Sequence, residues 1–460
     1  MHSSRSKILI LIGLFLSLFL AALDQTIIAT ASPSIIEDLK EPQHYSWIVT
    51  GYLLSSVIFL PIFGRLCDIF SVKILIIIAN FIFILGSYLC SLSNNMLELA
   101  FYRFIQGIGG GGIFSITFST IGILYTPRER GRIQGWIGSV FGFSSIIGPL
   151  LGGYLTELFS WHWVFFINVP LGIVILILLI RYMPYIPPIS EQKFDYIGGI
   201  LVFLWSFAFL LLFSEIQLFP FEKILYLFII IIGLLIFYKY EINHKYPLFD
   251  LSLLNNKTFT ISSFSIFLFG GPFIGSLIFF PLYLVQKYNI SVLHSGYIIT
   301  PLTFGIVISS TLAGKIASKT GKYKNILILS NIFVISIFGI LFILTKFFYV
   351  SLANIILIMI LLGFAFGPIL PLYVIAVQNS VSLKRIGTAT SSIQFFRQMG
   401  ATIGVALLGF IYSYFVKKYP EKSILFAFPY LMLVCSILSL LGLLFTYYLP
   451  DLELNHKHNI

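Results

Sequence analysis

Fourteen apolar segments of membrane-spanning length follow one another along these 460 residues and constrain the fold more than any other feature. A bilayer core of about 30 Å needs about 20 apolar residues in a helix. Lipid offers no hydrogen bonds, so each segment is expected to be α-helical. The sequence therefore predicts an all-α integral membrane protein with helices at 8–34, 45–63, 74–94, 98–123, 135–157, 162–182, 195–216, 222–240, 259–286, 295–313, 326–345, 353–376, 390–415 and 425–448.

The composition supports a membrane protein. Hydrophobic residues make up 58% of the chain and charged residues only 10%, whereas a soluble domain carries about a quarter charged residues. A net charge of +11 would suggest nucleic acid in a soluble chain, but here the basic residues are expected to mark topology, with no nucleic-acid partner. The three cysteines have no paired spacing, which indicates no metal site.

The basic residues are distributed unevenly between alternate connections. Most of the 28 Lys and Arg residues fall on one side, and only Arg103 and Arg397 lie inside the apolar segments. The positive-inside rule then places both termini in the cytoplasm, in the inner or plasma membrane of the cell. The first apolar run is too long for a signal peptide, so an uncleaved first helix is expected.

An internal repeat divides the chain. Gly64–Lys73 and Gly314–Lys322 are similar Gly-plus-basic turns that follow the second and tenth segments. They suggest two related six-helix halves, and duplicated halves are typical of transporters that rock around a central site. The predicted domains are an N-terminal six-helix bundle (1–183), a linker with two additional helices (184–258), a C-terminal six-helix bundle (259–449) and a cytoplasmic tail (450–460).

Asp24 is the most unusual residue for its position. It lies about 24 Å along the first segment by helical rise, slightly past the middle of the bilayer core. An ionised carboxylate there costs a few kcal/mol, so Asp24 must be protonated, paired or facing water. A proton-coupling role is favoured, with a hydrogen bond to a neighbouring helix as the structural alternative.

Seven motifs together resemble the fourteen-helix drug:proton antiporter branch of the major facilitator superfamily over nearly the whole chain. They are Leu23–Ile28 with Pro33, Trp47–Leu54, Gly64–Lys73, Arg103–Gly109, Gly142 with Gly148–Gly153, Trp161–Gly172, and Asp195–Leu201. The resemblance implies a major facilitator fold of two six-helix bundles plus two extra central helices. It also implies alternating access, no enzymatic activity and no cofactor. No phosphate-binding loop is present, so a proton gradient is the expected energy source.

The resemblance also implies roles for individual residues. Asp24 and Arg103 would couple protons, although Arg103 could instead extend to the outer membrane surface. The predicted gate residues are Gly64, Arg65, Asp68, Gly148, Pro149, Gly152 and Gly153. Asp68 has three candidate partners: Arg65, Arg128–Arg132 or a helix terminus. Pro149 and its neighbouring glycines predict a kinked helix that another helix can approach closely.

The second half contains no acid between Asp250 and Glu421. Carboxylate-based coupling must then lie in the first half, and a neutral or monocationic amphiphile is the favoured substrate, with an anion meeting Arg397 as an alternative. Ser318 replaces the acid of the second gate turn, so an acidic latch is expected on one side only. Candidate substrate-binding residues are polar side chains in apolar helices: Gln25, Thr26, Gln106, Tyr283, Gln286, Gln378, Asn379 and Gln398.

The favoured function is a proton-coupled antiporter that exports amphiphilic drugs or toxic compounds. The alternative is a same-fold transporter of a metabolite, a basic amino acid or a lipid-like cargo. A membrane enzyme or receptor is disfavoured because no histidine accompanies Asp24 on its helix. The expected partners are a small amphiphilic substrate, protons and the lipid bilayer. The sequence leaves the oligomeric state open, with a monomer as one option.

Overall fold

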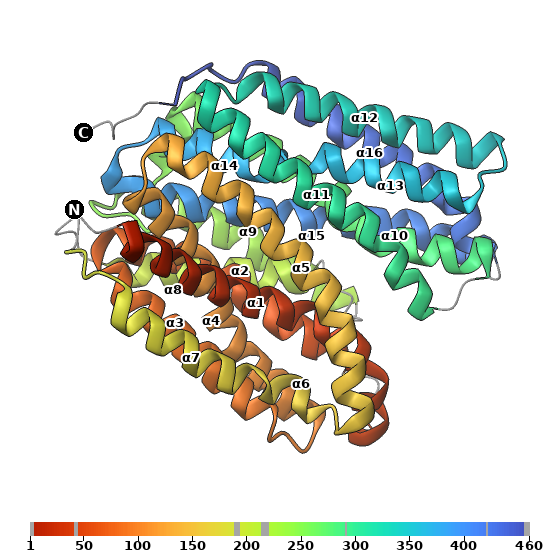
Figure 1. Cartoon of the computed structure of the whole chain (residues 1–460), viewed down its shortest axis with the longest axis horizontal. Helices are drawn as coiled ribbons and strands as arrows, with labels where there is room; N and C mark the ends of the chain where they lie inside the picture. Colours follow the sequence, from red (N-terminus) through yellow and green to blue (C-terminus); the bar gives the residue numbers. More distant parts are fainter. Residues whose placement is uncertain are drawn as a thin grey trace. The chain divides into compact units, whose positions relative to one another are not determined.

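The computed structural model describes residues 4–40, 45–187, 194–212, 220–289, 292–419 and 422–454, and helices joined by short connections make up this part of the chain (Figure 1). No strand occurs among these residues. The all-α prediction is therefore confirmed. The predicted cytoplasmic tail lies partly outside the described residues, at 455–460, and so does the predicted linker, at 188–193 and 213–219.

The helices follow one another in the predicted order. They are α1 (Ser4–Leu39), α2 (Tyr45–Ile69), α3 (Val72–Cys90), α4 (Met96–Leu124), α5 (Pro127–Leu158), α6 (His162–Phe166), α7 (Asn168–Tyr182), α8 (Tyr196–Leu212), α9 (Pro220–Asn243), η2 (Leu251–Asn255), α10 (Lys257–Tyr288), α11 (Val292–Thr320), α12 (Lys324–Phe347), α13 (Leu352–Phe366), α14 (Ile369–Ser380), η3 (Leu383–Arg385), α15 (Ile386–Lys418) and α16 (Ser423–Tyr447).

Thirteen segments of the described chain are long and apolar enough to cross a membrane. Three of them combine consecutive helices: α6 with α7, α13 with α14, and η3 with α15. The remaining predicted segment contains α8, whose apolar stretch Tyr196–Phe209 is shorter than a full span. The residues after α8, 213–219, lie outside the described part. The fourteenth span, which contains α8, therefore remains a prediction.

The chain forms two compact units. Unit 1 comprises Met1–Leu124, Phe143–Ser252 and Ser382–Phe395, and unit 2 comprises the rest. The start of α5 therefore belongs to unit 2, and the start of α15 belongs to unit 1. The predicted domain boundaries at 183 and 258 stay predictions.

Glycines let the helices of unit 1 approach each other closely. A Cβ on Gly107 or Gly111 of α4 would collide with backbone atoms of Tyr52 or Ser56 on α2. Small residues at such positions allow backbone-to-backbone packing in membranes, where no hydrophobic force holds helices together. The close packing of α4 fixes the positions of the polar side chains that α4 carries one turn earlier.

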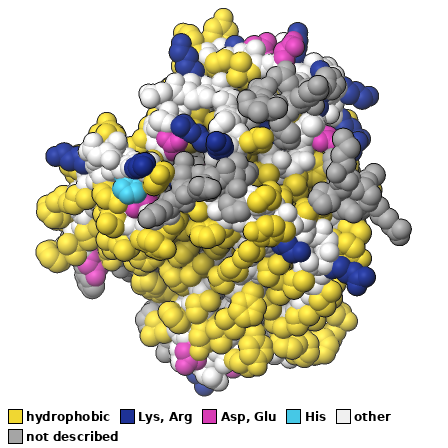
Figure 2. All heavy atoms as spheres, turned by 90° about the vertical axis from the view of Figure 1, so that its left-hand side faces the viewer, with side chains coloured by type: hydrophobic (Ala, Val, Ile, Leu, Met, Phe, Trp, Pro, Cys, Tyr) yellow, Lys and Arg dark blue, Asp and Glu magenta, His cyan; other side chains and the backbone are white. Residues whose placement is uncertain are grey.

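The outer faces of the helices are apolar. On α9, large side chains such as Ile224, Phe228 and Leu235 are more than half exposed. Hydrophobic side chains cover much of the face shown in Figure 2. Exposed apolar area on this scale is exceptional for a soluble protein and is expected for a protein in lipid.

Candidate functional site

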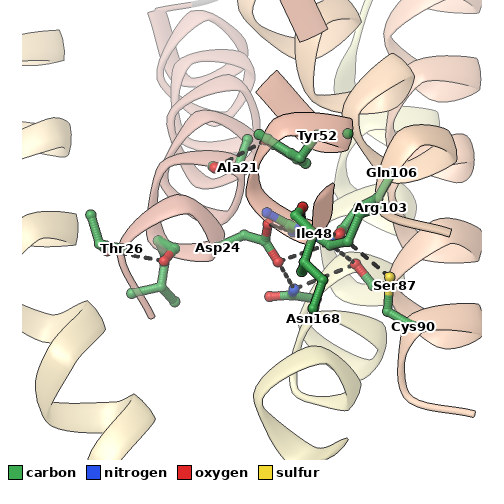
Figure 3. A network of polar contacts seen from close by, with 12 residues as sticks. Ala21, Asp24, Thr26, Ile48, Tyr52, Ser87, Cys90, Arg103, Gln106 and Asn168 are labelled. Carbon is green, nitrogen blue, oxygen red and sulfur yellow. Dashed lines mark hydrogen bonds and ion pairs between the residues drawn. The ribbon is translucent and has the colours of Figure 1, made fainter. Parts of the chain in front are cut away.

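Asp24 and Arg103 form a buried ion pair inside unit 1 (Figure 3). Asp24 lies just past the middle of the 36-residue helix α1, and Arg103 lies on α4. Their exposed fractions are 0% and 1%. The Nη1 group of Arg103 donates to Oδ2 of Asp24. Arg103 is therefore buried and paired and does not extend to the outer surface.

Two amides bind the carboxylate, and a serine hydroxyl in turn accepts from both amides. Oδ1 of Asp24 accepts hydrogen bonds from Nε2 of Gln106 at 2.8 Å and from Nδ2 of Asn168 at 2.9 Å. Both amides also donate to Oγ of Ser87, at 2.7 and 3.4 Å. The Oε1 atom of Gln106 accepts from Nη1 of Arg103 at 2.7 Å, which fixes the orientation of this amide.

The remaining contacts of Arg103 come from α2 and α6. Its Nε donates to the carbonyl oxygen of Ile48 at 3.3 Å. Its guanidinium carbon lies 4.3 Å from the ring centroid of Tyr52 and 5.7 Å from that of Phe165. Carboxylate, carbonyl and aromatic faces thus stabilise the cation where water is excluded. Helices α1, α2, α3, α4, α6 and α7 all contribute to this one site.

Sequence reasoning identified Asp24 and Arg103 together with Gln106, which it assigned to substrate binding, but it missed Asn168 and Ser87. Asn168 appeared only within a family motif. The same rule that singled out Gln378, that apolar helices seldom contain unpartnered amides, applies equally to Asn168. A serine that bonds across helices leaves no such signal, because serine commonly bonds within its own helix.

Replacing Asn168 by Ala is expected to lower transport about 10-fold. Asp24 would lose one buried donor, and a buried hydrogen bond to a charged group is worth about 1.5–3 kcal/mol. Ser87→Ala should have a smaller effect, since Ser87 does not contact the carboxylate. The check is a dose–response of efflux at equal protein amounts. Full activity of Asn168→Ala would show that Asp24 does not need this donor.

Asp68, at the end of α2, binds the start of α15 within unit 1. Its Oδ1 accepts from the Gly387 amide at 2.9 Å, and its Oδ2 accepts from the Thr388 amide at 2.9 Å and the Thr388 hydroxyl at 2.5 Å. The carboxylate therefore caps a helix N-terminus, where unpaired amides and the helix dipole favour negative charge. Of the three candidate partners, the helix terminus supplies the hydrogen bonds, and Arg65 also attracts the carboxylate electrostatically.

Glycines allow the end of α2 and the start of α15 to approach each other closely. A Cβ on Gly64 would collide with the Ser391 side chain, and one on Gly387 would meet the Gly64 carbonyl. Unit 2 contains a matching pair, because a Cβ on Gly314 would collide with the Gly131 carbonyl at the start of α5. The two gate turns thus pack alike, but the second turn carries Ser318 where the first has Asp68.

The Gly-Pro segment of α5 packs against α1 in unit 1. A Cβ on Gly148 would collide with Thr26, and one on Gly152 would collide with Thr30. Thr26 donates from Oγ1 to the Ser144 carbonyl at 2.9 Å. Gly153 has open space around it, and Pro149 lies inside the helix. The close approach predicted for this helix is present at Gly148 and Gly152, which lie four residues apart on α5 and face Thr26 and Thr30 of α1. Its sealing role stays a prediction.

The predicted substrate-binding residues of unit 1 lie near the ion pair. Gln106 is part of the Asp24 network itself. Thr26 is engaged with α5, and Gln25 forms a hydrogen bond with the Tyr52 hydroxyl. Gln25 and Thr26 are both partly exposed, and Gln25 is the one whose hydrogen bond leads to Tyr52 beside Arg103.

The predicted substrate-binding residues of unit 2 do not form one cluster. Tyr283 stacks on Phe428 at 4.1 Å between ring centroids, whereas Gln378 accepts from Gln134 at 2.9 Å and Asn379 donates to the Glu453 carbonyl at 3.1 Å. Asn256 bonds Ser380, so the start of α10 lies at the end of α14. By helical rise Tyr283 is then about 40 Å from Gln378. Gln286 and Gln398 are half-buried.

Comparison with known families identifies the chain. The model of the Major Facilitator Superfamily matches residues 14–405, and the chain belongs to this family of membrane transporters. Multidrug resistance protein 3 of Bacillus subtilis is 33% identical over 87% of this chain and 78% of its own length. Multidrug efflux pump SdrM of Staphylococcus aureus is 30% identical over 88% of this chain and 90% of its own. The family predicted from the seven motifs is confirmed, and these relatives are transporters, not enzymes.

Solved structures confirm the fold. The human organic anion transporter MFSD10 superimposes with a TM-score of 0.70 over 96% of this chain and 100% of its own, at 14% identity. The proton:xylose symporter XylE gives a TM-score of 0.70 over 98% of this chain and 97% of its own, at 15% identity. The major facilitator fold predicted from the sequence is thus confirmed.

Proposed function

We propose that this transporter is a proton-coupled antiporter that exports amphiphilic drugs or toxic compounds by alternating access. The observation that carries the proposal is the buried carboxylate of Asp24, held at mid-helix by Arg103 and two amides. Ionisable groups inside membrane helices mark proton relays and ion paths. Relatives named for multidrug resistance and efflux, at 33% and 30% identity, support the substrate class.

The donors around Asp24 favour the ionised carboxylate. Oδ2 receives the guanidinium, and Oδ1 receives two amide N–H groups. A proton on Oδ1 would compete with its two amide donors, and a proton on Oδ2 would remove the charge that the Arg103 guanidinium pairs with. Protonation therefore weakens the bonds that connect Asp24 to α4 and α7. In this proposal, proton binding at Asp24 is coupled to a displacement of α4 or α7.

Arg103 serves as the counter-ion of the cycle. Arginine does not release its own proton in a protein, so Arg103 acts by pairing with Asp24 in one state and separating from it in another. When Asp24 takes up a proton, Arg103 loses its anionic partner and turns to the Ile48 carbonyl and the Tyr52 ring. A cationic substrate that competes for Asp24 would displace the proton, and this competition couples the two fluxes.

The energy source in this proposal is the proton gradient, without a bound cofactor. The positive-inside distribution favours the cell membrane with both termini in the cytoplasm. The Asp68 cap of α15 would then lie on the cytoplasmic side, where it stabilises one of the two alternating states. Gly148 and Gly152 would seal the opposite side through α1.

The test of this function is a compound panel on the purified transporter in proteoliposomes, with a pH-sensitive dye inside. An exporter of this class releases protons when an amphiphilic monocation is added and gives no signal with sugars or amino acids. A signal confined to a metabolite, a basic amino acid or a lipid would instead support the alternative cargo on the same fold. Compound uptake at unchanged rate after collapse of the gradient would exclude proton coupling.

The charge distribution predicts discrimination between cations. Residues 251–420 contain no acid, so Asp24 is the deep anion that meets the substrate. A dication would leave one charge without a partner, at a cost of several kcal/mol. A divalent dye should therefore compete at least 10-fold more weakly than a monovalent dye of similar size. Competition assays with such a matched pair measure this ratio, and equal competition would show that one acid suffices for both.

A further inference from the structure

A second group of buried acids lies where α8 and α9 meet in unit 1. Asp195 comes just before α8, and Glu241 lies in the last turn of α9; they are only 3% and 2% exposed. Oδ2 of Asp195 and Oε1 of Glu241 converge on Gly198, where an added Cβ would lie 2.7 Å from the glutamate oxygen. Two buried carboxyl groups this close cannot both carry a negative charge without a large energetic cost.

The hydrogen bonds show which of the two carries the proton. Asp195 accepts from the Gly198 amide and from the Tyr240 hydroxyl, both at 2.9 Å, and thereby caps α8. Glu241 receives a long bond from the Phe249 amide, at 3.5 Å, and a further backbone bond from Leu248. One buried oxygen of each acid, Oε2 of Glu241 and Oδ2 of Asp195, has no hydrogen-bond partner, so the two short bonds to Oδ1 of Asp195 distinguish the pair. An anion is best stabilised by donors. Asp195 is therefore the better anion, and Glu241 is the better site for a proton.

His244 connects this pair to water. Its side chain is 32% exposed, and its Nδ1 lies 3.5 Å from Oδ2 of Asp195. The same Nδ1 accepts from the Tyr246 amide at 3.3 Å. A neutral His244 keeps the bond from Tyr246, whereas a protonated His244 would direct an N–H toward Asp195. Histidine ordinarily changes charge between about pH 5 and pH 8.

The other charged groups around the pair are few. Arg65 of α2 interacts electrostatically with Glu241 and also with Asp68. Asp250, in the connection after α9, is paired with Arg385 at 3.2 Å. Two buried carboxyl groups, Asp68 and Glu241, thus share the field of one arginine. A proton on Glu241 removes one of the two negative charges that Arg65 faces, and so strengthens the attraction of Arg65 for an ionised Asp68, which caps α15.

We propose that Asp195, Glu241 and His244 form a second proton-binding site, separate from Asp24, which is coupled through Arg65 to the Asp68 cap of α15. A proton from water enters at His244 and converts the Glu241 carboxylate to the neutral acid. Proton binding strengthens the cap, and proton loss weakens it. The α8–α9 pair thereby makes the gate sensitive to pH on the Asp68 side.

The stability of the purified full-length protein tests the site without any transport. The folded chain holds a proton on Glu241 that the unfolded chain has lost near neutral pH, so the wild-type melting temperature should fall as pH rises from about 5 to about 8. Glu241→Gln removes this titration, so the difference between the two proteins should change by about 2 °C or more across the range. Glu222→Gln, at the other end of α9, is the matched control and should follow the wild type.

Amide hydrogen exchange at Gly387 and Thr388, corrected for the intrinsic rate, tests the coupling. The ratio of wild-type protection to that of Glu241→Gln should fall at least 3-fold with rising pH, since any titration of Asp68 itself is common to both proteins. Parallel melting curves of wild type and Glu241→Gln would overturn the site. A rise in wild-type stability with Na⁺ or K⁺ at fixed pH, absent in Glu241→Gln, would overturn the proton as its ligand. Neither measurement depends on Asp24, so the failure of either proposal leaves the other testable.

Discussion

Asp24→Asn is expected to abolish gradient-driven export while the protein still inserts into the membrane. The amide keeps the size of the side chain but cannot take up and release a proton, so drug addition should no longer release protons from proteoliposomes. The measurement is the initial rate of drug-driven proton release, with an expected loss of at least 100-fold. Unchanged proton release would disprove the role of Asp24 in coupling.

The same variant has a structural cost that must be separated from coupling. It leaves the buried guanidinium of Arg103 without its anion, and breaking a buried ion pair costs about 3–5 kcal/mol. The double variant Asp24→Asn with Arg103→Gln removes both charges and should be more stable than the single variant. It should nevertheless remain uncoupled. Asp38→Asn is a control on the same helix, because Asp38 bonds Trp161 at the end of α1, away from the ion pair.

Asp68→Asn is expected to weaken the start of α15 and to reduce transport about 10-fold. The amide would turn an N–H toward the Thr388 amide and hydroxyl, which now donate to a carboxylate oxygen. Loss of a helix cap costs about 1–2 kcal/mol, and 1.4 kcal/mol is a tenfold change in a two-state population. Hydrogen exchange at Gly387 and Thr388 should rise by the same factor.

A matched control for the cap exists in the second gate turn. Ser318→Ala alters the position that corresponds to Asp68 but removes no carboxylate, so exchange at Gly387 and Thr388 should stay at the wild-type level. Asp68→Glu should recover less than half of the lost transport, because the longer side chain displaces the carboxylate from both amides. Wild-type transport by Asp68→Asn would show that the cap does not stabilise a state of the transport cycle.

Much of the site could be predicted because membrane energetics make it conspicuous. An ionised carboxylate in an apolar membrane helix has a high free-energy cost whichever way it faces. Asp24 could therefore be identified without knowledge of the tertiary structure. Arg103 and Gln106 followed from one short motif on one helix. Asn168 was missed although the rule for amides in apolar helices applies to it, and Ser87 was missed because a hydroxyl in a helix is unremarkable until its partner is known.

The gate shows the same limit at longer range. Asp68 was identified as a latch with three candidate partners, and the partner found lies 320 residues away in sequence. Such a pairing depends on which helix N-terminus packs beside α2. The close contact between Gly64 and Gly387 brings the start of α15 to α2, and no local sequence pattern predicts this contact. Glu241 likewise reads as an ordinary charge at a helix end until α8 and α9 bury it against Asp195.

The sequence by itself determined the membrane class, the order of the helices, the family and the residue at the centre of the ion pair. These follow from hydrophobicity, charge and local motifs, which act residue by residue. Only the tertiary structure decided which donors hold Asp24, which helix Asp68 caps and which acids share Arg65. The physical reason is that a buried charge is stabilised by its neighbours in space, and those neighbours come from helices far apart in the chain.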